Sequence, residues 1–163
     1  MTDQVYRQVV ELVLQAAKLA RSVGIENILQ PGLVKEMIMA ELLGHQVILT
    51  KRHADACSRK DPNVLYEYLS CKEGGSGQFD RMFKEPPDKR EESLNRIRRN
   101  AMVYFAVFYS EEQTKVKVIY ELEVPVVVTE TERQLDRSAN AISHVGFSEP
   151  WVKRNGKVVY QDK

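Results

Sequence analysis

An apolar, aromatic run extends from Val64 to Lys72. Turn-forming residues border it on both sides, Asp61-Pro62-Asn63 before it and the glycine-rich segment 73–77 after it. Such a run between turn signals is typical of a β-strand. Side chains alternate along a strand, so one face carries Tyr66, Tyr68, Ser70 and Lys72 and the other carries Leu65, Glu67, Leu69 and Cys71. The sequence therefore predicts a central strand with a lysine at its end.

The length of 163 residues predicts a single domain, residues 1–163, with one sizeable core. A hydrophobic content of 43% and a charged content of 29% are ordinary for a soluble protein, and no apolar stretch approaches the ~20 residues of a membrane helix. The polar start of the chain predicts a cytoplasmic protein with no membrane partner. The two cysteines and three histidines have no zinc-type spacing. A net charge of +1 excludes a strongly basic coat for nucleic acid, so any DNA-binding charge must be local.

Periodicity along the chain predicts an α/β fold with a central mixed β-sheet flanked by helices. Helical spacing of apolar residues covers 5–23 and 33–43, a charged helix starts near Asp88, and a polar helix follows at about 129–143. The predicted strands are 46–50, 55–58, 64–72, 102–109, 115–124 and 157–160. Residues 78–83 read as a helical turn or a loop. The chain thus divides into N-terminal helices (5–43), a core (about 46–109) and a C-terminal hairpin, helix and tail (110–163).

Three acidic and basic features follow one another in a suggestive order: Asp55, then Ser70-Cys71-Lys72 at a strand end, then Glu91-Glu92 at a helix start. This order resembles the PD-(D/E)xK nuclease superfamily. It is most similar to type II restriction endonucleases that write the second motif as Ser-x-Lys and take the missing carboxylate from the next helix. The resemblance spans roughly 33–109. It implies a restriction-endonuclease-like fold and magnesium-dependent, sequence-specific cleavage of double-stranded DNA without a nucleotide cofactor.

The resemblance also implies the roles of individual residues. Asp55, Glu92 and the backbone carbonyl of Cys71 would hold Mg²⁺, while Lys72 would orient the attacking water and offset the phosphate charge. Ser70 stands where most members have a carboxylate, which is why Glu92 is needed. Glu91 and Glu85 remain alternatives for Glu92. Glu85 fits the usual interval after the lysine better, but two prolines follow it.

Two further glutamates compete for supporting roles. Glu36 resembles the glutamate that many of these nucleases carry before the first strand, and Glu41 is its rival. Glu67 is a possible ligand within the central strand itself. Strand alternation places Glu67 on the face away from Lys72, so the sequence argues against it.

DNA recognition is expected after the central strand, where Gln78, Asp80 and Arg81 could read base edges in the major groove. Arg96 and Arg99 belong to a basic helix that could follow the phosphate backbone. The alternative interpretation is an ordinary charged loop and a solvated helix face. One cleavage centre per chain and two strands per duplex predict a homodimer, with the two N-terminal helices as its interface.

Two other functions stay open at this stage. A structure-specific repair or junction-resolving nuclease could use the same core. A non-catalytic DNA-binding domain is favoured by Ser70 in place of the usual carboxylate.

Overall fold

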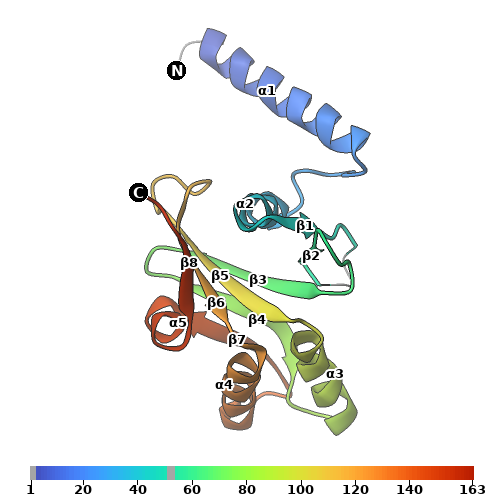
Figure 1. Cartoon of the computed structure of the whole chain (residues 1–163), viewed down its shortest axis with the longest axis vertical. Helices are drawn as coiled ribbons and strands as arrows, with labels where there is room; N and C mark the ends of the chain where they lie inside the picture. The colour runs from blue at the N-terminus through green and yellow to red at the C-terminus, as the bar shows by residue number, and fades with distance from the viewer. Residues whose placement is uncertain (1–2, 51–53) are drawn as a thin grey trace. The chain divides into compact units, whose positions relative to one another are not determined.

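The computed structural model describes residues 3–50 and 54–163 (Figure 1). Its internal contacts divide the chain into two compact units, Met1–Lys35 and Glu36–Lys163. The first contains α1 (Asp3–Ser22), which ends where Gly24 adopts a positive φ of 86°. The expectation that the whole chain forms one domain stays a prediction.

The second unit is built on a six-stranded sheet with the order β1-β2-β3-β5-β6-β8 (Figure 1). The strands are β1 (His45–Val47), β2 (Ala56–Ser58), β3 (Leu65–Lys72), β5 (Met102–Phe108), β6 (Val116–Leu122) and β8 (Lys157–Gln161). β3 and β5 are parallel, which requires a crossover, and α3 (Pro87–Arg98) lies within it. The other pairs of neighbouring strands in this sheet are antiparallel. The predicted α/β fold with a central mixed sheet is confirmed.

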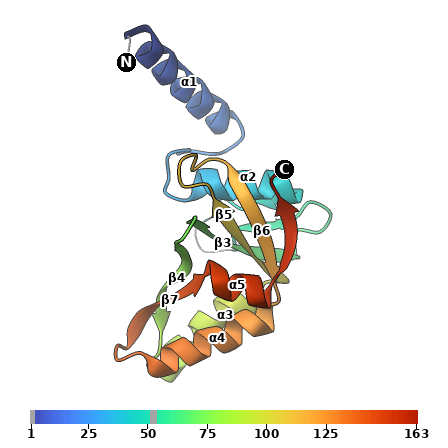
Figure 2. The ribbon, with the colours of Figure 1, turned by 90° about the vertical axis from the view of Figure 1, so that its left-hand side faces the viewer.

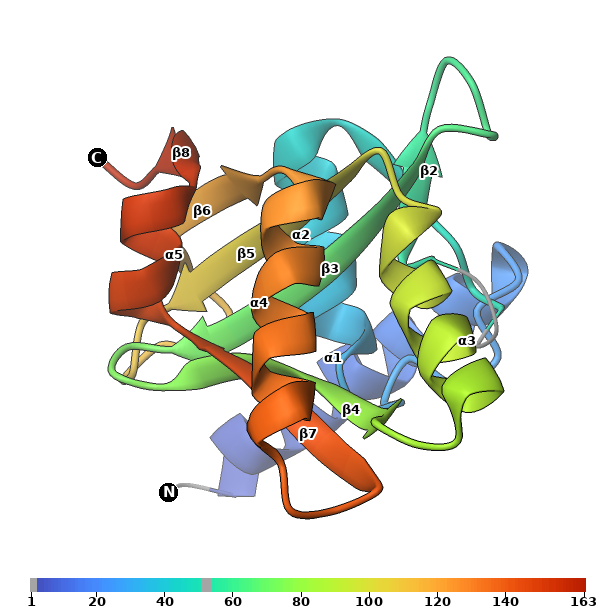
Figure 3. The same cartoon turned by 90° about the horizontal axis from the view of Figure 1, so that it is seen from below.

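Helices cover both faces of this sheet (Figure 3). Alternate residues of β5 explain why: Val103, Phe105 and Val107 join one core, whereas Tyr104, Ala106 and Phe108 join the other. The first core also takes apolar residues from α3 and α4 (Val124–Arg137), and the second takes Met39 and Ala40 from α2 (Leu33–Leu43). A near-continuous apolar strand is typical of such a two-sided position.

A second sheet of two strands, β4 (Ser76–Phe83) and β7 (Ile142–Ser148), corrects the interpretation of 78–83 as a loop or helical turn (Figure 2). β4 alternates buried Gly77 and Phe79 with exposed Gln78 and Asp80. A bulge at Arg81, whose φ is 53°, interrupts this alternation after Asp80. The bulge explains why period-two patterning was hard to see in the sequence.

The helix predicted at 129–143 was also misplaced. Pro125 occupies an early helical position, where its missing N–H costs nothing, so α4 begins at Val124 and ends at Arg137. Residues 142–148 then form β7, and α5 (Glu149–Asn155) follows with Ser148 accepting a hydrogen bond from the Trp151 N–H. The first predicted strand is shorter than expected, ending at Val47.

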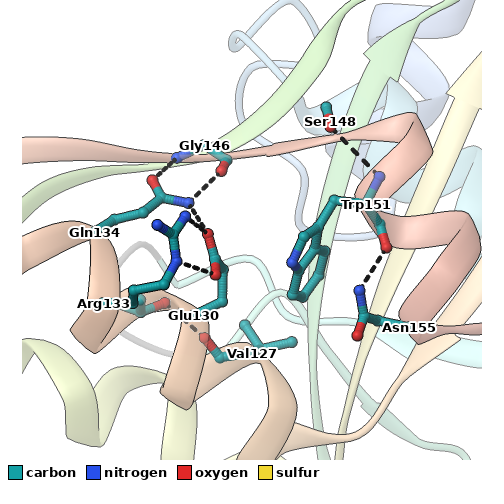
Figure 4. A network of polar contacts seen from close by, with 9 residues as sticks. Val127, Glu130, Arg133, Gln134, Gly146, Ser148, Trp151 and Asn155 are labelled. Carbon is teal, nitrogen blue, oxygen red and sulfur yellow. Dashed lines mark hydrogen bonds and ion pairs between the residues drawn. The ribbon is translucent and has the colours of Figure 1, made fainter.

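The side chain of Gln134 on α4 forms hydrogen bonds to the backbone of β7 (Figure 4). Its Nε2 donates to the Gly146 carbonyl at 2.7 Å, and its Oε1 accepts from the Gly146 N–H at 3.1 Å. Nε2 also donates to Glu130, whose carboxylate binds Arg133 as well. The second sheet is thus held in place by side-chain as well as strand contacts.

At Gly77, β4 lies against β3 and β5 with no room for a side chain. A Cβ at this position would lie 2.8 Å from Phe105 Cε2 and 3.2 Å from Leu69 Cβ. Because Phe105 is fully buried, it has no room to retreat. We expect Gly77→Ala to lower the free energy of unfolding by about 1–3 kcal/mol in urea titrations. Gly146→Ala is the matched control, since its nearest atom is Ser76 Oγ at 4.0 Å, and an equal loss in both variants would contradict the crowding argument.

Within residues 3–50 and 54–163, no helix is both long and apolar enough to cross a membrane.

Candidate functional site

Asp55 is fixed at the edge of the central sheet, where β2 and β3 stop pairing. The last β2 partner of β3 is Ala56, opposite Tyr66. Beyond it, Asp55 Oδ2 accepts a hydrogen bond from the Tyr68 N–H at 2.8 Å, and the Asp55 carbonyl accepts one from the Ile48 N–H at 2.9 Å. The carboxylate therefore occupies the place that a longer β2 would have taken beside β3.

Glu67 of β3 is the second carboxyl group at this edge. Its Oε2 is buried and has no hydrogen-bond partner in the part of the chain that the structure describes. Burial and then the nearby Asp55 charge raise the pKa of Glu67. Burial also raises the pKa of Asp55, against the Tyr68 hydrogen bond and the charges of Arg99 and Arg96, which lower it. Two buried carboxyl groups side by side are costly to ionise together unless a cation joins them.

Glu36 of α2 adds a third carboxyl group. Burial and the charge of Asp55 raise its pKa to about 7. We call Glu36, Asp55 and Glu67 the acidic site. The structure thus brings Glu36 close to Asp55, two residues that the sequence selected for one site.

Two arginines at the C-terminal end of α3 act on the acidic site. The charges of Arg99 and Arg96 both lower the pKa of Glu67. Arg96 Nη1 also donates to the Asp80 carbonyl at 3.5 Å, a long contact that joins α3 to β4. Positive charge therefore lies between the acidic site and the second sheet.

The exposed side of β4 carries the other residues predicted to contact DNA. Gln78, Asp80 and Arg81 are all exposed. Asp80 Oδ1 lies 2.8 Å from Nδ1 of His144, which projects from β7. Together with Arg96, these side chains form a polar surface of both charges beside the acidic site.

The Ser-x-Lys motif is not part of this cluster. Asp55 is bonded to the backbone of Tyr68, and Lys72 lies four residues farther along β3, about 13 Å away at the usual rise of a strand. Lys72 is exposed and its carbonyl accepts from the Gly75 N–H in the turn to β4. Ser70 and the buried Cys71 belong to the same distant end of the strand. The structure therefore does not bring Lys72 to Asp55.

Glu92 and its alternatives are also separate from the acidic site. Glu92 is exposed on α3 and pairs with Lys89 at 3.1 Å. Glu91 pairs with Arg98, and Glu41 pairs with Arg59. Glu85 lies in the turn that leads into α3. None of these four carboxylates is among the charges that shift the pKa of Asp55.

Sequence reasoning discounted Glu67 because it faces away from Lys72. The two side chains do point to opposite faces of β3, as expected. Asp55, however, lies near Glu67 and not near Lys72. The signal that could have identified Glu67 is a carboxyl group on the core-facing side of an apolar strand, beside Leu69 and Cys71. Such a group costs stability unless it has a task or a partner.

Only a magnesium ion that uses few protein ligands would suit the carboxyl groups of the acidic site. No three His, Cys, Asp or Glu side chains converge into a metal-binding group among the residues described. Mg²⁺ often uses only one or two carboxylates and keeps several waters. Asp55 and Glu67 supply two carboxylates, and Oε2 of Glu67 has no hydrogen-bond partner among the described residues. These two residues would hold the ion.

A hollow of about 340 Å³ lies between α4 and α5 (Figure 4). Its lining residues are Pro125, Val126, Thr129, Glu130, Trp151 and Asn155. The Glu130 carboxylate is already engaged by Arg133 and Gln134, which hold its pKa low. The hollow thus has no carboxylate oxygen comparable to the partnerless Oε2 of Glu67.

Comparison with known proteins adds no assignment, since no protein-family profile and no curated protein matches the sequence.

Proposed function

We propose that this protein is a magnesium-dependent endonuclease that cuts double-stranded DNA at the acidic site. The observation that carries the proposal is the buried, partnerless Oε2 of Glu67 beside Asp55. A divalent cation would relieve the repulsion between these two carboxylates and leave open positions for water and a phosphate oxygen.

Bound Mg²⁺ supplies a Lewis acid and lowers the pKa of a coordinated water. Asp55 contributes a carboxylate whose orientation is set by the Tyr68 N–H. Glu36, with a pKa of about 7, is suited to accept the proton of the attacking water near neutral pH. Arg96 and Arg99 offer guanidinium groups to the phosphates on either side of the cleaved bond.

The proposal keeps the PD-(D/E)xK superfamily but changes the residues assigned to it. Asp55 and Glu67 take the two carboxylate positions in place of Asp55 and Glu92. Leu69 then stands where the superfamily has its lysine, and Leu69 is buried. Sequence-specific cleavage, as in type II restriction endonucleases, would depend on base contacts from Gln78, Asp80 and Arg81. We place this activity in the cytoplasm, as the sequence predicts.

The leucine at position 69 supports a second candidate. A site that binds Mg²⁺ and DNA but lacks a lysine for the chemical step could bind DNA without cutting it. The two candidates share the metal ligands and the DNA surface. Only a cleavage measurement separates them.

Cleavage of supercoiled plasmid DNA by the purified protein, in Mg²⁺ and in EDTA, tests the proposal directly. We expect nicked or linear product only with Mg²⁺, and no product from Asp55→Asn because the variant loses a metal ligand. Lys72→Ala is the control that separates the two site assignments, and we expect its rate to stay within about threefold of wild type. An inactive wild type that still binds DNA more tightly in Mg²⁺ would favour the non-catalytic candidate. Loss of cleavage in Lys72→Ala would instead show that the catalytic site lies at the Ser-x-Lys end of β3.

A further inference from the structure

The helix α1 exposes a continuous apolar seam. The seam consists of Val5, Val9, Leu12, Ala16 and Leu19, and Val23, in the turn directly after α1, continues it. The five large side chains among them are 49%, 52%, 65%, 70% and 66% exposed in chain order. Soluble monomers rarely leave such a contiguous apolar stripe in water.

The spacing of the seam matches a two-stranded coiled coil. Intervals of four and three residues alternate from Val5 to Val23, which is the a/d pattern of a heptad repeat. No charged residue interrupts it. An α-helix with this period buries the seam best against another helix with the same period.

The seam is complementary to itself in the antiparallel direction. If Val5 faces Val23 of a second copy, then Val9 faces Leu19 and Leu12 faces Ala16, so every a position meets a d position. Each of these layers occurs twice because the arrangement has a twofold axis. The large Leu12 meets the small Ala16, which allows the two helices to approach closely at the centre.

The net charges of the two halves of α1 favour the same direction by long-range attraction, since none of the charged residues flanks the seam. Its first half carries Asp3, Arg7 and Glu11, whereas its second half carries only Lys18 and Arg21. A parallel copy would place the two basic halves together. An antiparallel copy places the basic half against the half with the acidic residues, and it also opposes the two helix dipoles.

We propose that α1 is a dimerisation element, and that the α1 helices of two copies of this chain pair antiparallel through the seam. This pairing rests on α1 alone and is independent of the proposed cleavage. It also specifies which of the two N-terminal helices forms the interface.

Matched leucine substitutions test the proposal in the full chain. Leu12 lies in the seam, while Leu14 lies outside it on the same helix, and the two are similarly exposed at 65% and 63%. In sedimentation equilibrium across a concentration series, we expect a wild-type dimer and at least a tenfold rise in the dimer dissociation constant for Leu12→Asp. Leu14→Asp should dimerise like wild type. A monomeric wild type, or equal weakening by both substitutions, would overturn the proposal.

Cysteine cross-linking tests the direction of pairing. In the proposed register Gln15 flanks the axis and faces Gln15 of the second copy, whereas Gln8 faces Ser22. Under mild oxidation, Gln15→Cys should form a disulfide-linked dimer, and Gln8→Cys should do so only when mixed with Ser22→Cys. The native Cys57 and Cys71 are buried, so the wild-type protein is the negative control for cross-linking. A cross-link in Gln8→Cys alone but none in Gln15→Cys would contradict the antiparallel arrangement, and a monomer that instead binds lipid vesicles would overturn the dimer itself.

Discussion

Replacing Glu67 by glutamine is expected to abolish Mg²⁺-dependent cleavage while making the metal-free protein more stable at pH 8. Cleavage is lost because the variant lacks one of two metal carboxylates. Stability rises because the native carboxylate is buried, next to Asp55, with no partner for Oε2, and the neutral amide removes the cost of ionising it. We expect a gain of about 1–2 kcal/mol in the free energy of unfolding, measured by urea titration in EDTA.

Glu92→Gln is the control for this prediction, since its carboxylate is exposed and pairs with Lys89. It should leave both cleavage and stability close to wild type, because exposed ion pairs contribute little. A Glu67→Gln variant that is both less stable and fully active would show that Glu67 has a structural partner and no role with metal. The reverse pair of results, an inactive Glu92→Gln and an active Glu67→Gln, would support the helix glutamate that the sequence suggested.

The metal-free protein is also expected to lose stability as the pH rises from about 6.5 to 8, and Mg²⁺ should restore it. The folded-state pKa of Glu36 is raised to about 7, and that of Glu67 is raised as well. The folded protein therefore binds more protons than the unfolded chain in this window, so raising the pH favours unfolding. The stabilising contribution is complete below the ordinary pKa of a glutamate and is lost as the pH passes the raised values.

Thermal unfolding at a series of pH values, with EDTA or with MgCl₂, would measure this loss. We expect a decrease on the order of 2 kcal/mol in EDTA and a much smaller one in saturating Mg²⁺, since a ligand that binds only the folded state offsets the cost. His45 acts in the opposite direction at lower pH, because burial lowers its pKa, so the decrease is clearest above about pH 6.5. A stability that is flat across this range in EDTA would contradict the burial of the acidic site.

The parts of the fold that were predictable are those whose signal is local. Helical spacing identified α1 and α2, and a continuous apolar run identified β5 as a strand covered on both faces. β4 and β7 were missed because each depends on the other: Gln78 pairs with Gly146, far along the chain, and the bulge at Arg81 breaks the alternation. Pairing over such a separation leaves little trace in a single local pattern.

Two of the three carboxyl groups of the acidic site were predictable from the sequence, but Glu67 and the arrangement of the groups were not. The sequence selected Asp55, Glu36, Arg96 and Arg99, and the structure brings them to one edge of the sheet. The sequence could not reveal how far along β3 Asp55 lies, because that position follows from the strand register that places Ala56 opposite Tyr66. A shift of five residues along β3 is the difference between a site centred on Lys72 and one centred on Glu67.

The anchoring of Asp55 to Tyr68 links the acidic site to the local fluctuations of the sheet edge. β1 and β2 have three residues each, so this edge can open at a lower free energy than the whole domain needs to unfold. Whenever the edge opens, the Tyr68 amide loses its acceptor and Asp55 loses its orientation together. The fraction of molecules with Asp55 oriented as the proposed function requires is then set by the opening equilibrium of two short strands, and the exchange rate of the Tyr68 amide proton reports it.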